Sequence, residues 1–186
     1  MRDRKIYILL TDTGTVLTRM IRLYTKKNYN HASLSLDSNL EEVYSFGRKR
    51  PRNPFIGGFV KEDITNGLLH NAECVIYSCT ISQKQYEEIQ AFLNEIESHE
   101  HSYRYNLLGL FAFMLKKEIR RKNAYFCSEF VATALTKGEI VQLRKPPSFV
   151  APHDFEEVGD FQLEYRGKLA SFYHNKNHSY QLSLSS

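Results

Sequence analysis

The sequence has few of the features that cross-link a chain or anchor it in a membrane. It contains only three cysteines, and this odd number, without metal-like spacing, predicts neither a disulfide framework nor a metal site. The longest apolar run, "YNLLGLFAFML", is about half the length that a transmembrane helix needs. The apolar run near the N-terminus is too short for a signal-peptide core. We therefore expect a cytoplasmic protein without a metal or other cofactor.

The basic residues gather in three places along a chain whose net charge is +4: Lys26 with Lys27, residues 48–52 and residues 116–122. Such clusters usually form solvated faces, and an anionic membrane surface is the alternative partner. We expect no nucleic-acid partner. The hydrophobic share, 42%, is that of an ordinary globular protein. It predicts one domain over residues 1–175, followed by a frayed tail rich in Asn and Ser over residues 176–186.

Apolar periodicity in the first half of the chain predicts both strands and helices. A buried strand is predicted over residues 5–10, ending in the turn "TDTG". Apolar residues at three- and four-residue intervals predict helices over residues 15–27 and 83–97, the second with Ser82 as its N-cap. The segment "HASLSLDSNLEEVYSFG" alternates with a period of two on both sides of "DSN", which predicts a β-hairpin.

The remaining segments complete the prediction of an α+β fold. "GFVKEDI" and "ECVIYSCTI" predict strands, whereas the prolines and glycines of "RKRPRNPFIGGF" predict an irregular loop. "FQLEYRGKLASFY" alternates around "RG" and predicts a final hairpin. A helix over residues 126–137 is expected to end at Gly138. We predict an antiparallel sheet of five or six strands with this last helix packed against it.

Cys127 lies at the N-terminal end of the helix predicted over residues 126–137, in the segment "YFCSEF". A thiol is a useful nucleophile only as the thiolate, which a helix N-terminus or a neighbouring imidazolium favours. Cys127 also shares the inward face of this helix with Phe130 and Ala134, where it would suit the core equally well. Helix position alone leaves both interpretations open.

A nucleophilic cysteine requires a histidine within hydrogen-bond reach, and His31 has the most informative context. It opens a predicted strand, and its ring is expected on the face opposite Ala32 and Leu34. A histidine in a strand is otherwise a solvated polar residue. The remaining histidines lack a supporting set of metal ligands. The other two cysteines, Cys74 and Cys79, face opposite sides of one predicted strand and suit core packing.

The histidine strand and the cysteine helix together resemble a known family. "NHASLSLDSNLEEVYSFG", followed much later by "YFCSEFVATAL", is similar to the circularly permuted branch of the NlpC-type papain-like cysteine hydrolases. That branch has a strand that begins with histidine, a second strand, and later a helix that begins with an aromatic-Cys-Ser-Glu sequence. In unpermuted members the cysteine comes first. The resemblance covers about residues 5–155 and implies a permuted papain-like fold.

The resemblance also implies roles for individual residues. Cys127 matches the nucleophile, His31 the general base, and Tyr125 the aromatic residue before the cysteine that helps to line the substrate pocket. Relatives tend to have an acid in the second strand, where this chain has Ser45. A serine hydroxyl can accept a hydrogen bond from the imidazole but brings no charge to stabilise imidazolium. Glu42, on the opposite face of that strand, is the alternative residue to orient the ring.

The implied activity is acyl transfer, with a peptide or a cell-wall-derived amide as the expected substrate. Permuted relatives that resemble lecithin retinol acyltransferase act on lipid esters, and this is a second interpretation. The basic clusters and the apolar "LLGLFAFML" segment would bring such an enzyme to an anionic membrane. A third interpretation is a non-catalytic binding domain in which Ser45 marks a degraded triad.

Overall fold

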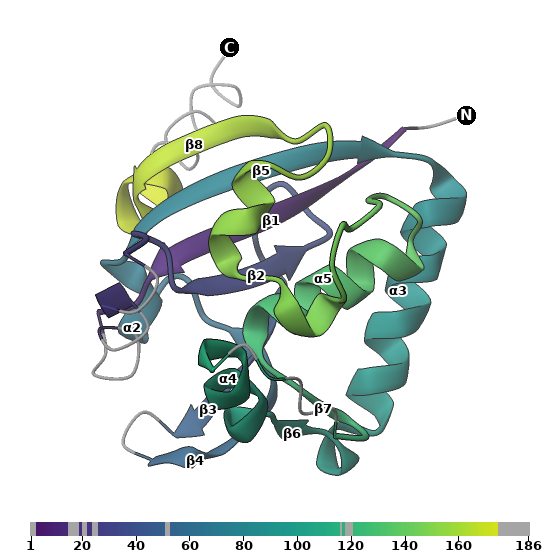
Figure 1. Cartoon of the computed structure of the whole chain (residues 1–186). Coiled ribbons are helices and arrows are strands. Elements are labelled where there is room, and N and C mark those ends of the chain that lie inside the picture. The colour runs from purple at the N-terminus through teal and green to yellow at the C-terminus, as the bar shows by residue number, and fades with distance from the viewer. Residues whose placement is uncertain are drawn as a thin grey trace.

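The protein is built on a six-stranded antiparallel sheet (Figure 1). The computed structural model describes residues 3–14, 19, 22–23, 26–50, 53–115, 117 and 121–174. Along the sheet the strands follow the order β4-β3-β2-β1-β5-β8. Their bounds are Arg4–Asp12 for β1, His31–Ser35 for β2, Val43–Arg50 for β3, Asn53–Glu62 for β4, Glu73–Ile81 for β5 and Gln162–Lys168 for β8. The predicted α+β class and antiparallel sheet are confirmed.

Two longer helices, α3 (Gln83–Ser98) and α5 (Cys127–Lys137), lie against one face of this sheet (Figure 1). The shorter elements are α2 (Gly67–His70), α4 (Leu107–Met114), β6 (Arg104–Tyr105), β7 (Ala124–Tyr125) and three 3₁₀ turns, η1 (Glu100–Ser102), η2 (Pro147–Phe149) and η3 (Pro152–Glu156). Strands β6 and β7 form a separate parallel pair. Among the described residues, no helix is long and apolar enough to span a bilayer.

The alternation of side chains along the strands divides the core into two layers. On the face that carries α3 and α5, Ile8 of β1 and Leu34 of β2 pack with Phe130 of α5 in the larger cluster. On the other face, Leu9 and Ile76 belong to a second cluster. Because the central strands are buried on both faces, they hold the ends of their neighbours in fixed positions.

The helix predicted over residues 83–97 is confirmed as α3. Ser82 caps it, because its hydroxyl accepts a hydrogen bond from the backbone N–H of Gln85, whose side chain in turn accepts from the N–H of Ser82. The predicted cysteine helix is α5, which begins one residue later than expected with Phe126 at its N-cap position. The N-terminus of α5 is therefore at Cys127 itself.

The predicted hairpin that begins at His31 is confirmed as β2 and β3, which pair antiparallel with Leu34 opposite Tyr44. Asp37 organises the connection, since its carboxylate accepts hydrogen bonds from the backbone N–H groups of Asn39, Glu41 and Glu42. This turn fixes the register of the two strands.

The loop predicted for "RKRPRNPFIGGF" is wrong, because its described residues, 48–50 and 53–59, belong to β3 and β4. Pro54 is tolerated because β4 is an edge strand of the sheet. Gly57 serves a close approach between chain segments. A Cβ at that position would lie 2.5 Å from the carbonyl oxygen of Gly47 and 2.7 Å from Cβ of Tyr105. The glycines thus allow β6 to pack on the hairpin.

The final hairpin predicted around "RG" is also wrong. Strand β8 runs through Gly167 and is followed by helical residues 169–174, and among the described residues it pairs only with β5. Gly167 adopts φ 150°, which lets the strand continue where a turn was expected. Most of the helix predicted over residues 15–27 lies outside the described residues, as does the tail of residues 176–186.

Candidate active site

The fold brings Cys127 and His31 together, although 95 intervening residues separate them in the sequence. Cys127 is the first residue of α5 and His31 is the first residue of β2, and the two elements are in contact. The thiol lies close enough to the imidazole to help raise the pKa of His31. Cys127 is buried at the end of its helix. The predicted cysteine–histidine pair is therefore present as a geometric unit.

A largely buried carboxylate lies on the other side of the His31 ring. Nε2 of His31 lies 2.6 Å from Oε1 of Glu62, which is the last residue of β4. The second carboxylate oxygen accepts a hydrogen bond of 2.7 Å from the hydroxyl of Ser33. Because Nε2 faces Glu62, Nδ1 is the ring nitrogen left for the thiol. Thiol, imidazole and carboxylate thus form a continuous chain.

The two residues predicted to orient His31 have different positions in the structure. Ser45 is beside the ring, with its hydroxyl oxygen 3.2 Å from Nε2, and it helps to lower the pKa of Glu62. Glu42 points elsewhere, since its carboxylate accepts hydrogen bonds from the hydroxyl of Tyr44 and the ammonium of Lys61. The alternative that Glu42 orients the ring does not agree with this geometry.

Glu62 was not predicted from the sequence as a site residue. It ends the strand predicted from "GFVKEDI", where Val60 and Glu62 alternate with Phe59 and Lys61. In the sheet, β3 lies between β2 and β4, so Glu62 reaches His31 across an intervening strand. The sequence did contain one signal for Glu62. It is an acidic residue of β4 that lies on the same face of the sheet as the small polar residue Ser45 of the neighbouring strand β3. That signal can be used only when the alignment of β3 with β4 is known, in which Ser45 pairs with Val60.

The environment of the His31–Glu62 pair favours the charged form of both groups. Burial alone lowers the pKa of His31, but the negative charges of Glu62 and Cys127 and their hydrogen bonds outweigh it and hold the pKa well above its ordinary value. Burial raises the pKa of Glu62, but the charge of His31 and hydrogen bonds from His31, Ser33 and Ser45 lower it overall. The ring is thus an imidazolium held against a carboxylate.

The His31–Glu62 pair is expected to stabilise the fold most between pH 4.5 and 6.5, the ordinary pKa values of the two groups. Because the pKa of Glu62 is lowered on folding, its contribution is complete above 4.5 and is lost as the pH falls through the lowered value. Because the pKa of His31 is raised, its contribution is complete below 6.5 and is lost as the pH rises through the raised value.

Urea unfolding of wild type and Glu62→Gln measures this contribution across the pH range. The two side chains are only 13% and 11% exposed. We therefore expect the variant to lose about 2 kcal/mol of unfolding free energy near pH 5.5, because a buried imidazolium loses its charged partner. The difference should shrink at both ends of the range. A difference independent of pH would contradict the ion pair.

The two residues after the cysteine in "CSE" anchor the start of α5. The hydroxyl of Ser128 donates a hydrogen bond of 2.7 Å to the carbonyl oxygen of Val150, which holds the segment after η2 against the helix. The carboxylate of Glu129 turns back and accepts from the backbone N–H of Phe126 at 3.3 Å. Both side chains are buried. They fix the helix N-terminus, and hence the thiol, in place.

The ring of Tyr125, the residue that the resemblance assigns to the substrate pocket, packs in an aromatic cluster. It stacks on Tyr103 with ring centroids 6.2 Å apart and meets Phe46 and Phe92 edge-on. Phe126, the residue directly before the nucleophile, instead packs with Leu110 of α4. The aromatic residues before Cys127 therefore join the cysteine to α4 and to the core.

No protein-family model, curated protein or solved structure matches this chain. The resemblance to permuted papain-like hydrolases therefore depends on the motif residues and on the geometry around them. Within the part of the chain that the structure describes, no group of three or more His, Cys, Asp or Glu side chains could hold a metal ion.

Proposed function

We propose that the protein is a cysteine hydrolase with a permuted papain-like fold, in which Cys127, His31 and Glu62 form a catalytic triad. The observation that carries the proposal is the position of the His31 ring between a thiol and a buried carboxylate. A nucleophile, a base and an orienting acid in this order are the recurring arrangement of enzymes that transfer acyl groups.

The first half of the reaction forms an acyl-enzyme. The thiolate of Cys127 attacks the carbonyl carbon of an amide or ester, and the carbon–sulfur bond forms as the carbonyl oxygen becomes an oxyanion. The backbone N–H of Cys127 or of the next residue, at the N-terminus of α5, lacks an intrahelical acceptor and is suited to stabilise that oxyanion. Collapse of the intermediate breaks the bond to the leaving group, which takes a proton from His31.

The second half releases the acyl group. His31, neutral after donating its proton, removes a proton from water, and the hydroxide attacks the thioester carbon. The carbon–sulfur bond breaks, which restores the thiolate and the imidazolium and yields a carboxylic acid. Glu62 keeps the ring in one orientation and stabilises its positive charge, while Ser33 and Ser45 hold the carboxylate.

A peptide or a cell-wall-derived amide is the first candidate substrate, because the resemblance implies it. A lipid ester, or transfer of its acyl group to another acceptor, is the second candidate. The observation in its favour is the apolar helix α4, which packs through Leu110 on the residue before the nucleophile. Glu62 weakens the case for a degraded triad, since it supplies the negative charge that Ser45 cannot.

Trapping the acyl-enzyme tests the proposal directly. The protein is mixed with p-nitrophenyl esters of short and long acyl chains and with peptide p-nitroanilides, quenched in acid and weighed by intact-mass spectrometry. We expect a mass increase equal to the acyl group, located on Cys127 by peptide mapping, and none in Cys127→Ala. Acyl groups on Cys74 or Cys79, or no adduct with any substrate in the panel, would overturn the proposal.

A further inference from the structure

Helix α4 is an apolar helix at the surface of the protein. Its sequence, LLGLFAFM, contains no charged or polar side chain, and a helix that is apolar on all sides is normally buried. Here Leu108 is 57% exposed, and Leu115, directly after the helix, is 71% exposed. Large leucine side chains exposed at the two ends of one apolar helix indicate a surface that contacts something apolar.

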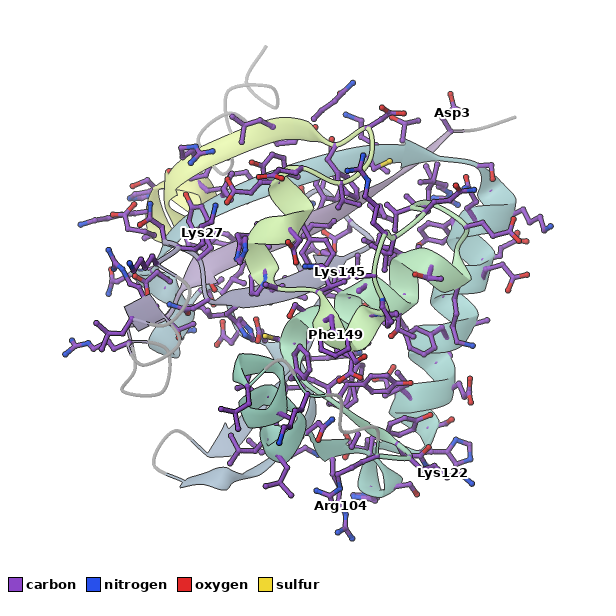
Figure 2. All side chains as sticks on the ribbon, viewed as in Figure 1. Asp3, Lys27, Arg104, Lys122, Lys145 and Phe149 are labelled. Carbon is purple, nitrogen blue, oxygen red and sulfur yellow. The ribbon has the colours of Figure 1, made fainter. Side chains whose placement is uncertain are left out.

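Exposed basic side chains precede and follow α4 along the chain. Lys117, Arg121 and Lys122 follow the helix and are exposed, as is Arg104 just before it. Figure 2 shows Arg104 and Lys122 at the end of the molecule that carries α4, β6 and β7. We call these four residues with Leu108 and Leu115 the α4 patch. An apolar centre with this basic rim suits a partner that is apolar and anionic.

The α4 patch is fixed next to the proposed catalytic site. Leu110, on α4, is buried against Phe126, the neighbour of Cys127. The turn η2 contacts both α4 and α5, and Phe149 of η2 lies between the two helices in Figure 2. The start of α4 is held as well, because the side-chain oxygen of Asn106 accepts a hydrogen bond from the N–H of Gly109. Whatever contacts α4 therefore also lies beside the start of α5.

We propose that the α4 patch docks the protein on an anionic bilayer surface. Leu108 and Leu115 enter the boundary between headgroups and acyl chains, and the basic rim pairs with lipid phosphates. Charge decides the choice of partner. A second copy would bring two basic rims together, which repel each other, whereas an anionic membrane satisfies the rim and the leucines at once. Docking in this way places the N-terminus of α5 near the lipid surface.

Vesicle flotation tests the docking. Wild-type protein is mixed with phosphatidylcholine vesicles or with vesicles that contain about 30% phosphatidylglycerol, at low and at high salt. We expect flotation only with the anionic vesicles, and loss of at least about tenfold in affinity when salt rises from about 0.05 M to about 0.5 M. Equal binding to both vesicle types, or none to either, would overturn the proposal. The proposal would also be overturned if sedimentation showed a wild-type dimer that becomes a monomer in the variant with Leu108→Ser and Leu115→Ser.

Matched variants distinguish binding through the α4 patch from binding through the net charge of the protein. Lys117→Glu with Lys122→Glu is compared with Lys84→Glu with Lys168→Glu, which changes the net charge equally at exposed positions on α3 and β8. The first pair should weaken vesicle binding at least about tenfold and the second less than about threefold. Equal effects of the two pairs would show binding through net charge and would overturn the assignment to α4.

The leucines have their own control. Leu108→Ser with Leu115→Ser should lower affinity by about tenfold or more. Leu163→Ser changes a leucine that is 55% exposed on β8, far from α4 in Figure 1, and should have no effect. Vesicle binding needs no thiolate, so Cys127→Ala is expected to bind as wild type. Failure of docking and failure of catalysis therefore give different results.

Discussion

His31→Ala is expected to slow the alkylation of Cys127 by iodoacetamide at about pH 6 by roughly 10- to 100-fold, because the thiolate loses its imidazolium partner. Only the thiolate reacts with iodoacetamide at a useful rate, and the thiol lies close enough to His31 to help raise the pKa of the ring. The labelling rate is measured for each cysteine separately by peptide mass spectrometry across a range of pH. The rate at Cys127 should be higher in the wild type than in the variant, and the difference measures the contribution of His31.

The chain contains its own control for access to the thiol. Cys79 is 8% exposed and Cys127 is 6% exposed, so the two residues differ little in their exposure to solvent and reagent. Burial raises the pKa of Cys79, and it raises the pKa of Cys74 to about 12. Both should therefore stay unlabelled at about pH 6 while Cys127 reacts. If Cys127 and Cys79 reacted at equal rates, or if His31→Ala changed neither, Cys127 would be an ordinary core cysteine.

Glu62→Gln is expected to reduce the acyl-transfer rate by on the order of 10²- to 10⁴-fold, whereas Glu42→Gln should change it less than about twofold. Glutamine keeps the shape and hydrogen-bonding capacity of Glu62 but removes the charge that stabilises the His31 imidazolium. The rate of acyl-enzyme formation is measured at about pH 7 and across pH, with the fraction of folded protein checked by circular dichroism.

The comparison of the two glutamates is informative because both substitutions remove one negative charge. Glu62 lies 2.6 Å from the ring nitrogen, while Glu42 pairs with Lys61 at the surface. Ser45→Ala should have a smaller effect than Glu62→Gln, about tenfold, because Ser33 still holds the carboxylate. Equal losses at Glu42 and Glu62 would remove Glu62 from the proposed triad, and a larger loss at Ser45 would make the serine the principal orienting residue.

Local patterns were sufficient for the elements that carry the thiol and the imidazole. A period of two around "DSN" predicted β2 and β3, and a period near four predicted α3 and α5. These predictions hold because each element buries one face and because its ends are set by nearby residues, such as Ser82 at the start of α3. The contact between Cys127 and His31 was predicted only with the help of the family resemblance.

The same local rules failed between residues 48 and 59. Prolines and adjacent glycines usually interrupt strands, but here the strand lies at the edge of the sheet, where Pro54 costs no ladder bond to a second neighbour. Gly57 is required by the approach of Tyr105 from β6, a contact between distant parts of the chain. Composition therefore indicated an interruption where packing had selected the same residues for a close approach.

The sequence by itself determined the α+β class, the cysteine at the start of a helix and the histidine at the start of a strand. Each of these follows from periodicity and capping, which are properties of neighbouring residues. Only the tertiary structure decided that Glu62, rather than Glu42, stands behind His31, and that α4 lies beside the nucleophile. The physical reason is register, because which side chains of β2, β3 and β4 meet depends on how three strands align, and no local pattern specifies that alignment.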